Sequence, residues 1–333
     1  MLLAVCAVLP GQALACTPSA RTTISGATYS PAAVAAGKVP TLSGQAGLTC
    51  PTTVLVLLGG NYVRGTFASA NAFKLKNGSR ELAYAVFVDS GGTVPITQNG
   101  QIDYMQNNLL NLLGLLGGSS ATLPLYVKPG SAAGLPYGDY VDTITVQWDW
   151  RICNIAYAAG ACLGTLTQGT GRTDITVRLT VGPQDVTMTL SSVITWDPVN
   201  GTSGPFALPG AKGRTTLAVR NPDLVPLDAG SIALIYKVPA KASVALDGDG
   251  TTSATVVGFA EGSPASGTTL TYTAANSISD DVDFSADDGA TWTYVPVPGN
   301  RVSEAAITHL RLRPRGAMKA GGTFTLSFPY LVR

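Results

Sequence analysis

The segment from Gly138 to Trp150 constrains the fold more than any other part of the chain, because apolar and polar side chains alternate along it. One parity carries Tyr140, Ile144, Val146, Trp148 and Trp150, and the other carries Thr143, Thr145, Gln147 and Asp149. Successive side chains of a strand point to opposite faces. The pattern therefore predicts an antiparallel strand with one buried and one solvated face, as in a β-sandwich.

Short strand patterns recur along the whole chain. The 38 glycines and 21 prolines separate them and favour turns over helices. A length of 333 residues suggests two domains, and Gly182-Pro183 marks a boundary, because proline cannot donate a hydrogen bond within a sheet. We therefore expect an all-β protein with two antiparallel β-sandwich domains, Ig-like or pilin-like, in tandem at 16–182 and 184–333.

The individual strands are predicted from runs of β-branched and aromatic residues between turn residues. In the first domain we expect strands at 21–25, 52–58, 72–75, 82–88, 121–127, 141–150 and 174–181. In the second domain we expect strands at 186–196, 215–219, 232–238, 254–259, 268–273, 282–285, 291–295, 308–313 and 323–332.

The first fifteen residues predict export. Residues 1–15 are apolar and end in Ala13-Leu14-Ala15, a signal-peptide cleavage pattern that places the cut before Cys16. The charged segment that usually precedes the apolar run of a signal peptide is missing, so the true start of the protein can lie upstream. The alternatives to a signal peptide are a buried first strand and a lipoprotein signal. No later run reaches the roughly 20 apolar residues of a spanning helix. We expect a mature chain without a transmembrane segment, exported through the periplasm to the cell surface or a pilus, or secreted.

Cleavage removes Cys6 and leaves four cysteines, which allow three pairings. Nearest-neighbour pairing predicts disulfides Cys16–Cys50 and Cys153–Cys162, which an oxidising compartment permits. A zinc site is the alternative, but no histidine lies near and the spacings do not suit paired ligands. We predict no metal and no cofactor.

The charge pattern and the candidate catalytic residues argue against an enzyme or a nucleic-acid-binding protein. Charged residues make up 12% and the net charge is +1, so no basic field attracts phosphates. The one histidine, His309, has no nucleophile motif beside it and is expected to be structural. The acidic residues near turns match no calcium loop and are expected to be solvated turn residues: Asp280, Asp281, Asp283, Asp287 and Asp288.

A leucine-rich insert between two predicted strands is the candidate binding feature. The segment 101–119 contains Leu109, Leu110, Leu112, Leu113, Leu115 and Leu116. If the segment projects from the sandwich, these leucines form an apolar surface-binding finger. The alternative is that they fold over one end of the sandwich as core.

Several motifs of the first half resemble the spore coat protein U domain family, the module of Csu-type archaic chaperone–usher pili. They are Cys16-Thr17 directly after the export signal, Cys50, Leu82-Ala83-Tyr84-Ala85-Val86-Phe87-Val88-Asp89, Leu123-Pro124-Leu125-Tyr126, the 138–146 segment, and Cys153 and Cys162 with Gly160, which are similar to a second bridge of some members. The second half resembles the Ig-like conserved-repeat domains of bacterial surface proteins, through 197–201, 208–211, 289–294 and 308–314.

The family resemblance implies assembly by strand donation. A subunit of this kind lacks one strand, which a chaperone or a neighbouring subunit supplies. It implies a periplasmic chaperone, an outer-membrane usher and pilin subunits as partners. The leucine-rich insert, in turn, predicts apolar surfaces as targets. A mature chain that begins at Cys16 has no donor segment, which is expected of a tip-like subunit that mediates attachment and biofilm formation. The alternative for the first domain is a self-complete sandwich.

A free secreted binding module for a glycan or a protein is the alternative function. A glycan site needs exposed aromatic platforms, for which Trp148, Trp150, Trp196 and Trp292 are the candidates. Trp148 and Trp150 share the parity of the predicted core, so we expect both to be buried.

Overall fold

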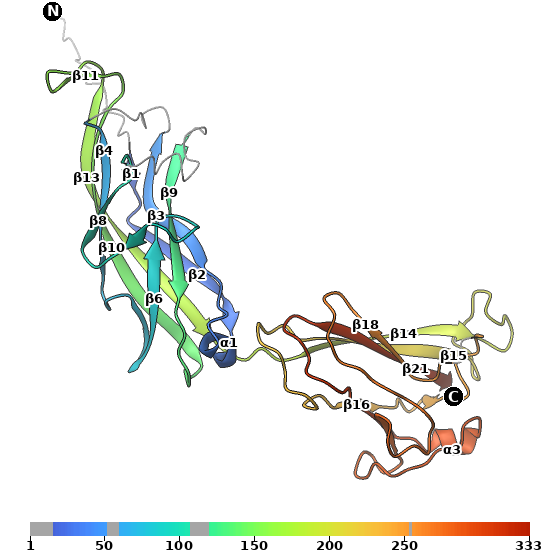
Figure 1. Ribbon diagram of the computed structural model, residues 1–333. Coiled ribbons are helices and arrows are strands. Elements are labelled where there is room, and N and C mark those ends of the chain that lie inside the picture. The colour runs from blue at the N-terminus through green and yellow to red at the C-terminus, as the bar shows by residue number, and fades with distance from the viewer. Residues whose placement is uncertain (1–15, 52–59, 107–119, 253–254) are drawn as a thin grey trace, which may run out of the picture. The chain divides into compact units, whose positions relative to one another are not determined.

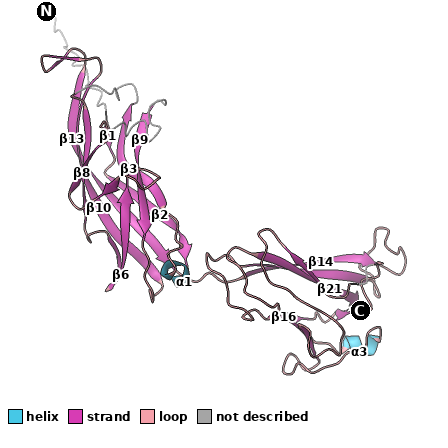
Figure 2. Cartoon of the chain, viewed as in Figure 1, coloured by secondary structure: helices cyan, strands magenta, loops and turns pink. Residues whose placement is uncertain are grey.

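The computed structural model describes residues 16–51, 60–106, 120–252 and 255–333. The chain divides into two compact units, Met1–Pro183 and Gln184–Arg333. Strands dominate both units, and the described helices are the short α1 (Pro31–Ala35) and α3 (Arg301–Ala305) (Figure 2). This confirms the predicted all-β fold.

In the first unit, eleven strands form one hydrogen-bonded sheet, eight along its main path and three beside it, and this sheet folds over into two facing layers (Figure 1). One layer contains β1 (Thr17–Pro18), β3 (Leu42–Pro51), β9 (Ser120–Pro129), β6 (Arg80–Phe87) and β7 (Pro95–Ile96). The other contains β5 (Lys74–Asn77), β8 (Gly100–Asp103), β4 (Tyr62–Ser69), β10 (Gly138–Cys153), β13 (Leu166–Val181) and β2 (Arg21–Tyr29). All pairs are antiparallel except β13 with β2. The sequence patterns did not predict strands β3 and β4. The strand expected at 52–58 lies outside the described residues.

Strand β10 is the centre of this unit, as its alternation predicted. Its apolar parity, including Trp148 and Trp150, is buried against Phe67 of β4 and the apolar residues of β9. On its other edge, β10 pairs with β13 over an uninterrupted ladder of sixteen residues, from Gly138 opposite Val181 to Cys153 opposite Leu166. The buried state of both tryptophans confirms the expectation from parity.

Asp142 lies on the buried face of β10 and is a core residue that the alternation did not predict. Its Oδ2 accepts hydrogen bonds from Ser69 Oγ at 2.5 Å and Tyr84 Oη at 2.7 Å. Its Oδ1 accepts from the backbone N–H of Asn71 at 3.1 Å and of Thr143 at 2.7 Å. Burial, with the neighbouring Asp142 carboxyl, raises the pKa of Tyr84 and keeps its hydroxyl a donor. The carboxyl therefore joins β4, β6 and β10 from within the core.

The second unit has two sheets around its own core. The larger contains β14 (Thr187–Trp196), β15 (Lys212–Arg220), β21 (Thr323–Val332), β17 (Ala242–Val244) and β18 (Gly258–Glu261). The smaller contains β16 (Leu234–Lys237), β20 (His309–Leu312) and β19 (Val282–Ser285). Strand β21 lies inside the larger sheet and contributes Phe324, Leu326 and Phe328 to the core.

Two strands predicted for the second unit, at 268–273 and 291–295, are wrong. In the first of these segments, side chains take the place of the neighbouring strand that we expected. At 268–273 the backbone N–H of Thr271 donates to Asp281 Oδ2 at 2.8 Å, and that of Thr273 donates to Asp280 Oδ2 at 3.0 Å. The segment 291–295 is likewise no strand. Asp280 and Asp281 are buried and not solvated, which corrects our expectation for these two residues. Strand β18 begins only at Gly258, within the strand expected at 254–259.

Candidate functional site

The candidate site is the hairpin 154–165, which joins β10 to β13 at one end of the first unit (Figure 1). It contains the short strands β11 (Tyr157–Ala158) and β12 (Ala161–Cys162). Ala159 and Gly160 between them have φ of 47° and 81°, the left-handed values that a two-residue turn of type I′ requires. The hairpin is closed at its base by the Cys153–Cys162 disulfide, which confirms the predicted pairing.

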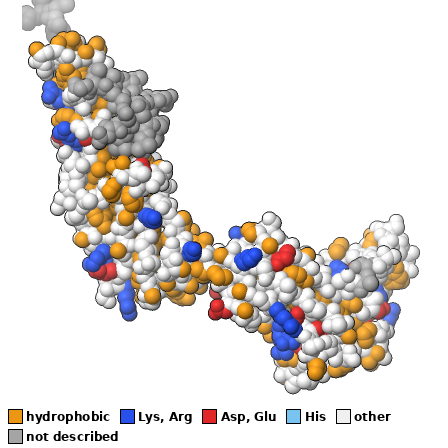
Figure 3. Space-filling model, viewed as in Figure 1, with side chains coloured by type: hydrophobic (Ala, Val, Ile, Leu, Met, Phe, Trp, Pro, Cys, Tyr) orange, Lys and Arg blue, Asp and Glu red, His pale blue; other side chains and the backbone are white. Residues whose placement is uncertain are grey.

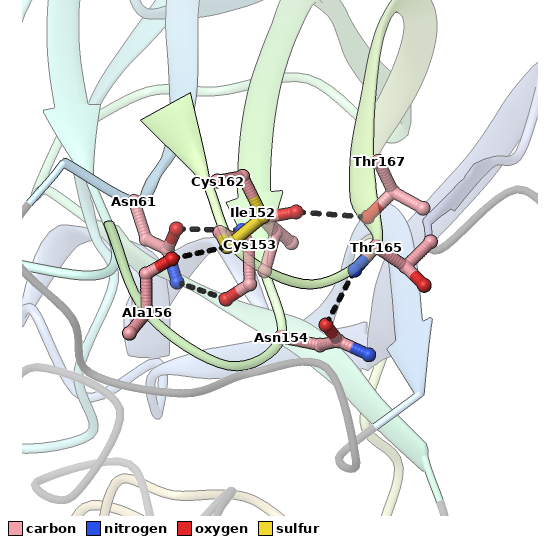
Figure 4. Close-up of a disulfide and its surroundings, with 8 residues drawn as sticks. All are labelled: Asn61, Ile152, Cys153, Asn154, Ala156, Cys162, Thr165 and Thr167. Carbon is pink, nitrogen blue, oxygen red and sulfur yellow. Dashed lines mark hydrogen bonds between the residues drawn. A yellow bond between two sulfur atoms is a disulfide. The ribbon is translucent and has the colours of Figure 1, made fainter. Parts of the chain in front are cut away.

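The base of the hairpin is fixed to the neighbouring strand by one amide side chain (Figure 4). The Asn61 Oδ1 accepts from the Cys153 N–H at 2.7 Å, and the Asn61 Nδ2 donates to the Cys153 carbonyl at 3.0 Å. The side chain thus makes the two bonds that a paired residue of a strand would make. Since Asn61 is itself buried, it anchors the disulfide to the body of the sandwich.

Further hydrogen bonds hold the hairpin in one shape (Figure 4). Thr165 N–H donates to Asn154 Oδ1 at 2.7 Å, and Thr167 Oγ1 donates to the Ile152 carbonyl at 3.2 Å. The Cys153 Sγ lies 3.1 Å from the Ala156 carbonyl oxygen. This is a contact and not a donated hydrogen bond, because a disulfide sulfur carries no proton.

The outer surface of the hairpin is apolar and uncharged. Ile155 is 62% exposed and Leu163 is 63% exposed, and Leu166 is also exposed beside them. From residue 154 to residue 166 the sequence has no charged side chain. Figure 3 shows hydrophobic atoms gathered at this end of the first unit. Exposed apolar side chains on a fixed scaffold are typical of a contact surface. Our sequence reasoning did not predict these residues, although an uncharged apolar run between two paired cysteines was visible.

The second predicted disulfide is also present. Cys16–Cys50 joins the start of β1 to β3, where Thr17 pairs with Thr49. The six leucines of the predicted surface-binding finger lie in 107–119, outside the described residues. Tyr104 and Met105 before this segment are buried, and the Tyr104 ring lies 5.9 Å from that of Trp148.

The residues that could carry chemistry have structural partners. His309 lies on β20, where its Nδ1 is 3.2 Å from the adjacent Thr308 Oγ1. Asp283 pairs with Arg311 and Arg313 at 2.8 and 2.9 Å. The Asp287 carboxyl accepts from Ser285 Oγ and from the backbone N–H and hydroxyl of Thr291, and these bonds lower its pKa to about 2. Within the described ranges, no group of three His, Cys, Asp or Glu side chains could hold a metal ion.

No helix among the described residues is long and apolar enough to cross a membrane. The first unit is thus a β-sandwich with two disulfides and an uncharged hairpin at one end. Residues 2–147, which make up most of the first unit, match the family model of the Spore Coat Protein U domain. The matched range ends before the hairpin 154–165. The family points to a structural protein and not to an enzyme.

Comparison with solved structures finds a similar protein in the crystal structure of the CsuC–CsuE chaperone–tip adhesion subunit pre-assembly complex, from archaic chaperone–usher Csu pili of Acinetobacter baumannii. The similarity covers 94% of this chain and 93% of that chain, with 14% sequence identity and a TM-score of 0.40. The curated proteins include no match to this sequence.

Proposed function

We propose that this chain is an exported subunit of a chaperone–usher pilus, and that the hairpin 154–165 attaches the fibre to apolar surfaces. The match of residues 2–147 to the Spore Coat Protein U family model supports the pilus assignment. Two disulfides support passage through an oxidising compartment. The proposed partners are a periplasmic chaperone, an outer-membrane usher and pilin subunits, and the proposed position is tip-like.

The observation that carries the attachment role is the exposure of Ile155 and Leu163 on a hairpin fixed at its base. Burying a whole leucine or isoleucine side chain contributes about 1.5–3 kcal/mol. Since about three fifths of each side chain is exposed, covering both contributes about 2–4 kcal/mol. The disulfide and the Asn61 bonds order the hairpin beforehand, so little of this free energy is spent on ordering it. Many subunits or fibres acting together would multiply the effect by avidity.

The leucine segment 107–119 remains part of this proposal as a second apolar contributor. It connects β8 to β9, whose first residue Ser120 pairs with Pro51 next to the Cys16–Cys50 disulfide. Its six leucines are Leu109, Leu110, Leu112, Leu113, Leu115 and Leu116. We expect them to add to attachment and not to stabilise the core.

Attachment is tested with the purified full chain on methyl-terminated and hydroxyl-terminated monolayers, by quartz crystal microbalance. The Ile155→Ser/Leu163→Ser variant should bind the methyl surface about 30-fold or more weakly. The matched control is Val302→Ser, because Val302 is 83% exposed on α3 of the second unit. Equal binding of the hairpin variant and the wild type would refute the attachment role.

The leucine segment is tested in the same assay with Leu112→Ser, Leu113→Ser and Leu115→Ser combined. A variant that binds less and melts at the wild-type temperature supports a surface role. A variant that unfolds would show that the leucines belong to the core. Pilus assembly is tested separately by co-expression with periplasmic chaperones of this class; a chain that never co-purifies with one is a free secreted binding module instead.

A further inference from the structure

Strand β14 of the second unit is an edge strand with one open side. It pairs with β15 from Thr187 opposite Arg220 to Trp196 opposite Lys212. In the part of the chain that the structure describes, no strand pairs with its other side, and it ends the order of its sheet. An open edge presents unpaired N–H and C=O groups that can accept a further strand.

The composition of β14 differs from that of the other edge strands. Proteins protect open edges with charged residues, prolines or very short strands. Five of the other described edge strands carry a charged residue: Arg21 in β2, Asp103 in β8, Lys237 in β16, Glu261 in β18 and Asp283 in β19. Strand β7 begins with Pro95, and the remaining edge strands have three residues or fewer: β1, β11, β12 and β17. Strand β14 has ten residues and contains no charged residue, no proline and no glycine.

Side chains of β14 are exposed on both faces of the sheet. Met188 is 52%, Leu190 is 56% and Val193 is 60% exposed. The strand is nevertheless held in place: Ser192 Oγ lies 3.0 Å from Thr215 Oγ1, and Thr195 Oγ1 donates to the Asp249 carbonyl at 2.6 Å. The edge is therefore ordered before any partner arrives, which lowers the entropy cost of pairing.

We propose that β14 pairs antiparallel with β14 of a second copy of this chain, with the two-fold axis at Ser191. A two-fold pair requires one patch to be complementary to itself. In this register the opposite residues are Ser191 with Ser191, Leu190 with Ser192, Thr189 with Val193, Met188 with Ile194, and Thr187 with Thr195. Pairs of hydroxyl, β-branched and apolar residues are favourable across strands, and no like charges oppose each other.

The same register joins the apolar side chains of both copies into one strip. Met188, Leu190 and Ile194 share a parity and therefore a face of the strand. Around the axis, Leu190 of one copy is the diagonal neighbour of Leu190 in the other, within reach of long side chains. This inference concerns the second unit and stands independently of the attachment role proposed for the first.

The oligomeric state of the full chain tests the proposal. Sedimentation velocity over a concentration series should show a monomer–dimer equilibrium. Leu190→Lys places two positive charges diagonally across the axis, and should weaken the dimer at least about tenfold. Val302→Lys, a charge introduced at another exposed apolar residue, should leave it unchanged. At concentrations well below the dissociation constant of the dimer, thermal unfolding should be the same for both variants, because Leu190 is exposed.

A cysteine at the axis tests the register. Opposite Cα atoms of an antiparallel pair lie about 4.5–5.5 Å apart, within the range of a disulfide. Ser191→Cys should therefore give a covalent dimer under mild oxidation, and Val302→Cys should not. A chain that stays monomeric, a dimer that tolerates Leu190→Lys, or a dimer that Ser191→Cys does not cross-link would each overturn the proposal. If the wild-type chain is monomeric and Leu190→Lys abolishes its binding to the chaperone, the edge is assigned to another protein instead.

Discussion

Asp142→Asn gives the sharpest test of how the first unit is held together. The substitution keeps the size of the side chain and replaces one carboxyl oxygen by an NH₂ group. If the NH₂ group takes the place of Oδ1, it faces the backbone N–H groups of Asn71 and Thr143, which cannot accept a hydrogen bond. If it takes the place of Oδ2, it faces the hydroxyls of Ser69 and Tyr84.

The second orientation is also unfavourable, because Ser69 has no acceptor capacity left. Its Oγ already accepts from the N–H of Asn71 at 3.1 Å and of Phe73 at 2.7 Å. Either orientation therefore breaks hydrogen bonds of the buried carboxyl, each worth about 1.5–3 kcal/mol when one partner is charged. With two such bonds lost or weakened, we expect the free energy of unfolding of the first unit to fall by about 3–4 kcal/mol.

The assay is urea unfolding of the full chain followed by tryptophan fluorescence, since Trp148 and Trp150 report on the core of the first unit. Asp149→Asn is the matched control: Asp149 lies on the opposite face of the same strand, and its contact with Tyr62 Oη is 3.4 Å. It should cost less than about 1 kcal/mol. In a Tyr84→Phe background, Asp142→Asn should cost less than in the wild type. If the Asp142 and Asp149 variants are equally stable, the carboxyl does not hold the core and the reasoning fails.

Three further predictions concern both units. Hydrogen bonds from the backbone N–H of Asn200, and from Phe206 and Val199, outweigh burial and lower the pKa of Asp197 from 3.8 to about 2. The stability that this carboxylate adds is complete above about pH 4 and is lost as the pH falls through 2. Asp197→Asn should therefore flatten the pH dependence of the free energy of unfolding of the second unit between these values. An unchanged slope of that free energy against pH would contradict this. Replacing Cys16 and Cys50, which are 34 residues apart, by serine should lower the stability of the first unit by about 4 kcal/mol in urea unfolding, and an unchanged midpoint would refute it. Gly47→Ala should lower the melting temperature, because Gly47 has a φ of +86° and an added Cβ would lie 2.2 Å from a threonine methyl. Gly134→Ala is the control for the effect of φ alone, because Gly134 has a φ of +66° and open space around it. An equal fall in melting temperature for both variants would contradict the steric argument.

The sequence allowed the strands of strong alternation to be predicted, because alternation depends on the strand itself. Strand β10 and its buried tryptophans are the best example. The same criterion missed Asp142, because parity assigns a face and says nothing of which hydroxyls and N–H groups converge on a carboxyl there. It also failed at 268–273, where Asp280 and Asp281 take the place of a neighbouring strand.

The candidate site was only partly predictable for a related reason. The pairing of Cys153 with Cys162 follows from their separation of nine residues and an oxidising compartment. The exposure of Ile155 and Leu163 does not, because it depends on where β10 and β13 end relative to the other strands. The open edge of β14 has the same origin: its strand pattern is local, but its place in the sheet is decided by residues more than a hundred positions away, in β21.

The long ladder between β10 and β13 has a mechanical consequence. Its sixteen residues span about 50 Å, with the hairpin at one end and the connection to the second unit just beyond Val181 at the other. A pull between a surface held by the hairpin and the second unit therefore runs along the covalent backbone of β13, which leads from the hairpin to Val181. Because β13 is already extended, it can carry this tension without lengthening and without breaking its hydrogen bonds to β10.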